Sequence, residues 1–182
     1  MQPVASEGPR ILGALSSADG RGVVHLQERL AASIDEVWSA ITDPSRLARW
    51  HSQVAGDLRP GGEFRIFVEA DDWEGTGRVV RCEPPQRLSV TSRESEESWR
   101  RGRGAAPFDS VLEVRLEADG DGTTIMVEVR GLPLEALAAY GAGWQIHVEN
   151  LAGHLAGRDR GDTEARWGVL IPAYEALAAG LG

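Results

Sequence analysis

The sequence predicts an α+β fold in which an antiparallel sheet is covered by one long helix near the C-terminal end. Between residues 22 and 130, several short segments alternate apolar and polar side chains and are separated by turn residues, which is typical of antiparallel strands. Residues 132–157 instead repeat apolar side chains with the period of a helix. No internal repeat or second-domain boundary is visible, so we expect one domain over residues 1–182.

The chain opens with two strand candidates. Ile11–Leu15 and Gly22–Leu30 flank the pair Asp19-Gly20, and this dipeptide is a strong hairpin signal. Residues 1–10 show no comparable pattern, and we expect them to form a disordered tail.

Two short helices are predicted next. Ser33 is followed three residues later by Glu36, which is the spacing of a capping box at a helix start. Asp43-Pro44 is a second start, because Asp is a good N-cap and proline fits the first helical position. Leu47 and Trp50 are expected on the inner face of the second helix, and the two short helices would cradle one end of the sheet.

The remaining strands are separated by turns and by one long polar loop. We expect them at Glu63–Ala70, Glu74–Cys82, Arg87–Arg93, Phe108–Ala118 and Thr123–Arg130. Ser92–Pro107 is polar and contains glycine, and its Trp99 is either a lid over a pocket or an exposed side chain. With the first hairpin, the sheet has about six to seven strands.

The long helix carries an unusual glycine. Its apolar stripe consists of Leu137, Gly141, Trp144, Val148, Leu151 and Leu155, with Tyr140 and His147 beside it. A glycine inside a helix costs about 1 kcal/mol relative to alanine, so Gly141 needs a reason. Close packing of the backbone is one reason, and room for a guest molecule between helix and sheet is another.

A C-terminal extension over residues 159–182 follows a charged link. Its residues Thr163–Leu181 predict a last helix, with Trp167 and Tyr174 on one face and Pro172 expected to kink or split it.

Composition restricts the partners and the compartment. The net charge is −9, which disfavours nucleic acid and anionic membranes, since both are bound by basic surfaces. No run of about 18 apolar residues and no signal peptide is present, and the single cysteine, Cys82, excludes an internal disulfide. We therefore expect a cytoplasmic protein.

Most catalytic and metal-binding patterns are missing from the sequence. His147 and His154 lie seven residues apart, which is about 10 Å along a helix and too far for one metal ion. Cys82 has no histidine near it in sequence, so an inert thiol is expected. We assign no catalytic residue, no metal and no cofactor.

Several motifs carry a family resemblance. Residues 37–50 read VWSAITDPSRLARW, residues 61–64 read GGEF, and G-x-G-x-V at 75–79 precedes E-P-P-x-x-L at 83–88. With Gly143-Trp144 in the long helix, this pattern resembles the activator-of-heat-shock-protein-90-ATPase-like family of the SRPBCC (START-like) superfamily, from about residue 22 to 157. The resemblance implies a helix-grip fold, with a curved antiparallel sheet around the long helix and an internal hydrophobic cavity.

Three functions remain open. The first is binding of a small apolar or aromatic molecule in the cavity. The second is a cyclase- or hydrolase-like enzyme that uses His147 with a carboxylate. The third is a chaperone-type interaction module with an exposed apolar patch at Ile146, Trp167 or Trp99, which would also serve a homodimer. The predicted ligand-binding residues are Trp50, Phe64, Ile66, Trp73, Val90, Ser110, Leu112, Tyr140, Gly141, Trp144, His147 and Val148.

Overall fold

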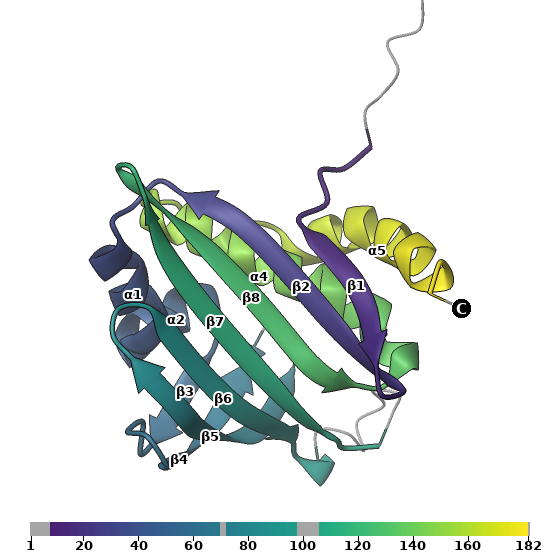
Figure 1. Cartoon of the computed structure of the whole chain (residues 1–182), viewed down its shortest axis with the longest axis horizontal. Helices are drawn as coiled ribbons and strands as arrows, with labels where there is room; N and C mark the ends of the chain where they lie inside the picture. The colour runs from purple at the N-terminus through teal and green to yellow at the C-terminus, as the bar shows by residue number, and fades with distance from the viewer. Residues whose placement is uncertain (1–7, 70–71, 98–105, 182) are drawn as a thin grey trace, which may run out of the picture.

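A computed structural model describes residues 8–69, 72–97 and 106–181, and within them eight strands form one antiparallel sheet (Figure 1). The strands are β1 Gly13–Ala18, β2 Arg21–Leu30, β3 Gln53–Gly56, β4 Glu63–Val68, β5 Trp73–Glu83, β6 Arg87–Glu94, β7 Asp109–Asp119 and β8 Gly122–Leu132. Their order is β1-β2-β8-β7-β6-β5-β4-β3. The chain therefore crosses from β2 to the far edge at β3 and returns strand by strand until β8 pairs with β2.

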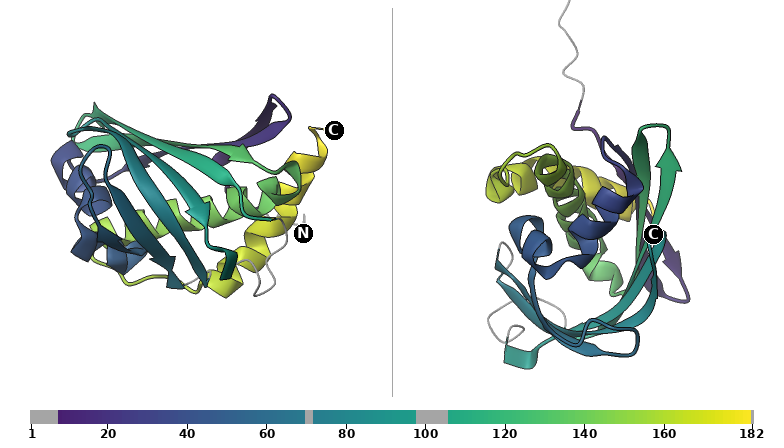
Figure 2. Two further views of the ribbon diagram at one scale, coloured as in Figure 1. Left: turned by 90° about the horizontal axis from the view of Figure 1, so that it is seen from below. Right: turned by 90° about the vertical axis from the view of Figure 1, so that its left-hand side faces the viewer.

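The helices lie on one side of the curved sheet (Figure 2). They are α1 Ile34–Thr42, α2 Pro44–Trp50, α4 Leu137–Leu155 and α5 Thr163–Ala179, with a 3-10 turn at Leu134–Ala136. Helices α1 and α2 sit at one end of the sheet, α4 crosses it lengthwise, and α5 lies beside β1 (Figure 1). The architecture is the predicted α+β helix-grip fold.

Both predicted helix starts are confirmed. The Ser33 hydroxyl accepts a hydrogen bond from the Glu36 N–H at 3.3 Å. The Asp43 carboxylate accepts from the N–H groups of Ser45 and Arg46 at 2.8 and 3.3 Å. These contacts lower the pKa of Asp43, led by its hydrogen bond with the Ser45 hydroxyl.

The sheet has one more strand than the upper predicted number. β3 has four residues, too few for a recognisable alternation, yet it pairs with β4 from Gln53–Phe67 to Gly56–Phe64. The long helix also begins later than predicted, because β8 continues to Leu132 and Pro133 precedes the 3-10 turn. The last helix runs through Pro172 as one element and is not split.

The described residues form three apolar clusters, one of which consists of Ala142, Ile146, Leu170 and Tyr174 between α4 and α5. The main one joins α1 and α4 to β2, β7 and β8, and it includes the alternating β8 residues Ile125, Val127 and Val129. A smaller cluster forms around Phe64, Val79 and Val90 on β4 to β6. Helix α4 covers the main cluster. A cavity lies between the main cluster and the cluster around Phe64.

Candidate functional site

The cavity has a volume of about 160 Å³ and is lined by residues of α1, α2, α4 and the inner face of the sheet. Seven of the predicted ligand-binding residues line it, namely Trp50, Phe64, Ile66, Val90, Leu112, Trp144 and Val148. The rest of its wall consists of Ile41, Thr42, Leu47, His51, Ser52, Val54, Leu58, Val79, Cys82, Leu88, Val114, Ile125, Val127 and Leu151. No charged side chain is among these described wall residues.

Two local features hold the aromatic walls of the cavity in place. The ring of Phe64 lies against Gly77 on the neighbouring strand, where an added Cβ would come within 2.6 Å of the ring. On the opposite wall, the Trp50 indole N–H donates to the carbonyl of Ala40 at 2.9 Å, so its polar atom is satisfied inside the protein.

Three predicted residues lie elsewhere. Trp73 packs over Gly75, where an added Cβ would be 2.4 Å from the indole. Ser110 shares a hydrogen bond of 3.1 Å with the hydroxyl of Ser92 on the adjacent strand. Tyr140 packs its ring against Phe108, with 5.7 Å between centroids. None of the three lines the cavity, because each is used in packing or pairing near the other end of the sheet.

Gly141 belongs to the packing of the C-terminal extension. An added Cβ at Gly141 would lie 2.4 and 2.7 Å from ring carbons of Tyr174 on α5, and 3.1 Å from Leu15 on β1. Of the two explanations that the sequence left open, the structure therefore favours close packing. Ile146, predicted as part of an exposed patch, is only 4 % exposed because α5 covers it. Trp99 lies outside the described residues.

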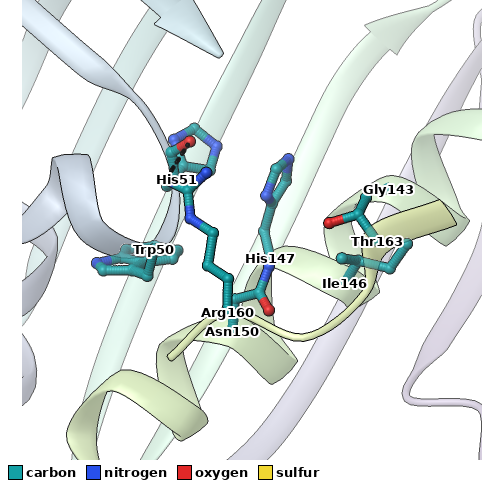
Figure 3. Close-up of a pocket in the computed structure, with 8 residues that line it drawn as sticks. All are labelled: Trp50, His51, Gly143, Ile146, His147, Asn150, Arg160 and Thr163. Atoms are coloured by element: carbon teal, nitrogen blue, oxygen red, sulfur yellow. Dashed lines mark hydrogen bonds between the residues drawn. The ribbon is translucent and has the colours of Figure 1, made fainter. Parts of the chain in front are cut away.

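His147 stands at the edge of the cavity, within a group of stacked rings. Its centroid is 4.3 Å from that of His51 and 5.5 Å from that of Trp144. His51 also stacks on Trp144 at 5.3 Å and touches Trp50 at the same separation. His147 and His51 come from α4 and from the end of α2, and Figure 3 shows them side by side.

His51 and Ser52 form a polar pair beside these rings, and neither was predicted from the sequence. The Nδ1 atom of His51 is 2.7 Å from the Ser52 hydroxyl oxygen, and both residues line the cavity. Burial, the neighbouring His147 and then Arg160 lower the pKa of His51 well below its usual value. The imidazole is therefore neutral at pH 7. The only sequence signal was the position of His51 directly after Trp50, a residue of the family motif.

Arg160 fixes the end of α2 from the link between α4 and α5. Its guanidinium donates to the carbonyls of Ala48 and Arg49, both at 2.9 Å. It also donates to the carbonyl of His51 at 3.5 Å (Figure 3). These carbonyls have no partner inside the helix, so the arginine acts as a C-terminal cap. Through its bond to the His51 carbonyl, Arg160 also holds His51 in place from a distant part of the sequence.

Among the described residues, no group of three or more His, Cys, Asp or Glu side chains is placed to bind a metal ion. The Cys82 thiol lines the cavity, and burial raises its pKa, so the unreactive thiol form is favoured. None of the described helices combines the length and the apolar character needed to cross a membrane.

Comparisons with known proteins agree with this architecture. The sequence profile described as "Activator of Hsp90 ATPase homolog 1-like protein" matches residues 31–156. The crystal structure of CalU16 from Micromonospora echinospora is 28% identical, with a TM-score of 0.70 over 92% of this chain and 96% of that chain. Its solution structure gives a TM-score of 0.73 at 28% identity, over 97% and 100% of the two chains.

A third similar structure is DynU16, from the dynemicin biosynthetic locus. It is 26% identical with a TM-score of 0.65, and the match covers 80% of this chain but only 51% of DynU16. A search of curated proteins found no match.

Proposed function

Because the chain belongs to the family of Activator of Hsp90 ATPase homolog 1-like proteins, we propose that it binds a small apolar or aromatic molecule between α4 and the sheet. The observation that carries the proposal is the cavity of about 160 Å³ with a mainly apolar, uncharged wall. Small-molecule sites are mostly apolar with a few polar groups, and an engineered apolar cavity of about 150 Å³ binds benzene. A ligand of one substituted aromatic ring therefore fits best.

The similarity to DynU16 supports the same class of partner. DynU16 is described as a protein of the dynemicin biosynthetic locus, and its match spans 80% of the present chain. We extend to this chain only the expectation of a small organic ligand. Its binding would be driven by burial of apolar surface, at about 25 cal/mol per Å² before the costs of association are subtracted.

Titration with p-xylene tests the proposal. We expect saturable binding by calorimetry and a rise in melting temperature with ligand concentration, because a ligand of the folded state stabilises that state. Leu112→Trp fills the cavity and should abolish both effects. Val111→Trp is the matched control, since adjacent strand residues point to opposite faces of the sheet. Absence of binding by p-xylene, toluene and indole to the wild-type protein would overturn the proposal.

The alternative functions have less support. An enzyme that pairs His147 with a carboxylate would need an aspartate or glutamate in the cavity wall, and none is among the described wall residues. An interaction patch at Ile146 is excluded by the burial of that residue beneath α5. A homodimer and a cytoplasmic location stay predictions from the sequence.

A further inference from the structure

The cavity has one polar end. Thr42, His51 and Ser52 come from the ends of α1 and α2, whereas the walls supplied by β4, β6 and α4 at the cavity carry apolar side chains. The Thr42 hydroxyl already donates to the carbonyl of Trp38 at 2.7 Å. The hydrogen-bonding capacity of this end therefore resides mainly in the neighbouring pair His51 and Ser52.

The backbone fixes this pair. The N–H groups of His51 and Ser52 both donate to the carbonyl of Leu47, at 2.9 and 3.2 Å. Ser52 is 3 % exposed, and the His51 ring packs against both Trp144 and His147. The pair therefore faces a ligand with little freedom to rearrange, which reduces the entropic cost of binding.

Either tautomer of His51 leaves the pair with a donor and an acceptor. If Nδ1 accepts a hydrogen bond from the serine hydroxyl, the imidazole keeps an Nε2–H donor and the hydroxyl oxygen keeps a lone pair. If Nδ1–H donates to the hydroxyl, the serine proton is the donor and Nε2 is an acceptor. A hydroxyl group, which both donates and accepts, suits both states.

The uncharged wall selects against ionised ligands. No Lys, Arg, Asp or Glu is among the described residues that line the cavity, and Arg160 is engaged with backbone carbonyls. A carboxylate or an ammonium group would lose its hydration without gaining a counter-ion, which is costly in an apolar site. The free-energy cost of desolvating a neutral polar group is much smaller.

We propose that the His51–Ser52 pair is the recognition end of the cavity and selects a neutral aromatic molecule that carries a hydroxyl group, such as a phenol. This inference rests on the proposed function, because it names the ligand class of the same cavity. It adds the residues that distinguish a hydroxylated ring from a plain hydrocarbon of equal size.

The test compares p-cresol with p-xylene, two rings of nearly the same shape in which a hydroxyl replaces a methyl group. Ser52→Ala should weaken p-cresol binding about three- to tenfold, as expected for one neutral hydrogen bond, and leave p-xylene binding unchanged. His51→Phe is the second variant and should have the same selective effect. Ser110→Ala is the matched control, because this hydroxyl is bonded to that of Ser92 away from the cavity, and it should alter neither affinity. Thr42→Val tests the third polar residue at the same end, whose hydroxyl is already bonded to the Trp38 carbonyl.

The outcomes separate the two proposals. If both compounds bind and Ser52→Ala and His51→Phe change their affinities equally, the recognition role is wrong while the cavity function stands. If Thr42→Val instead removes the selectivity, the hydroxyl is bound by Thr42 and the assignment to the pair is overturned. If neither compound binds the wild-type protein, the proposed function itself fails. Binding of 4-methylbenzoate at pH 7.5 as tight as that of p-cresol would also refute the selection of a neutral group.

Discussion

Gly141→Ala is the substitution that best tests how the C-terminal extension is packed. In the structure, the new methyl carbon would lie 2.4 Å from one ring carbon of Tyr174 and 2.7 Å from the next. Tyr174 is fully buried and its hydroxyl donates to Gln145 at 2.7 Å, so the ring cannot move away freely. The clash therefore has to be relieved by a shift of α5 against α4.

Gly143→Ala is the matched control on the same helix. Its new methyl carbon would meet only Trp167, at an ordinary contact distance of 3.7 Å. Both variants gain about 1 kcal/mol of helix propensity, so this term cancels between them. Overpacking costs about 1–3 kcal/mol, and we expect Gly141→Ala to be less stable than Gly143→Ala by that amount.

Urea denaturation of the two variants and the wild-type protein measures the difference in free energy of unfolding. Binding of p-xylene by Gly141→Ala should match that of the wild-type protein, because Gly141 does not line the cavity. If the two variants are equally stable and Gly141→Ala alone loses p-xylene binding, then the glycine provides space for the ligand and the packing argument is wrong.

Three further predictions concern the packing of α5 and the end of α2. Tyr174→Phe removes a buried hydrogen bond to Gln145 and should lower the unfolding free energy by about 1–2 kcal/mol in urea titrations; an unchanged value would contradict the network. Arg160→Ala leaves the last carbonyls of α2 uncapped and should lower the melting temperature, whereas Arg160→Lys should restore only part of it. The folded-state pKa of His51 lies below its unfolded value, so the unfolded chain binds its proton first and stability should fall as pH drops below about 6.5. His51→Gln should flatten this pH dependence in thermal melts at pH 5 to 7.5, and an identical slope in both proteins would refute it.

The fold was predictable because its signals are local. Capping residues such as Ser33 and Asp43 act within one turn of the helix that they start, and the alternation in β8 reports directly which side of the sheet is buried. The four-residue strand β3 was missed because it is too short to show a period and forms only through its pairing with β4.

The candidate site was predictable only in part. Apolar wall residues such as Phe64 and Trp144 follow from the predicted inner faces of strand and helix. The role of Gly141 depended on Tyr174, which lies 33 positions later on a helix whose docking could not be inferred from period alone. His51 was missed for a similar reason, because its environment is built by Trp144, His147 and Arg160 from distant parts of the chain.

Two parts of the chain outside the matched family region, Arg10 to Leu12 and helix α5, meet at Gln145. Its side-chain oxygen accepts from the Leu12 N–H at 3.0 Å and from the Tyr174 hydroxyl, while its amide nitrogen donates to the Arg10 carbonyl and the Glu149 carboxylate at 2.8 and 2.9 Å. This fully buried amide therefore ties the N-terminal segment and α5 to the same point of α4. Trp144, Val148 and Leu151 of the same helix line the cavity, so the two terminal segments and the Arg160 cap hold the helix and the end of α2 that a ligand would contact.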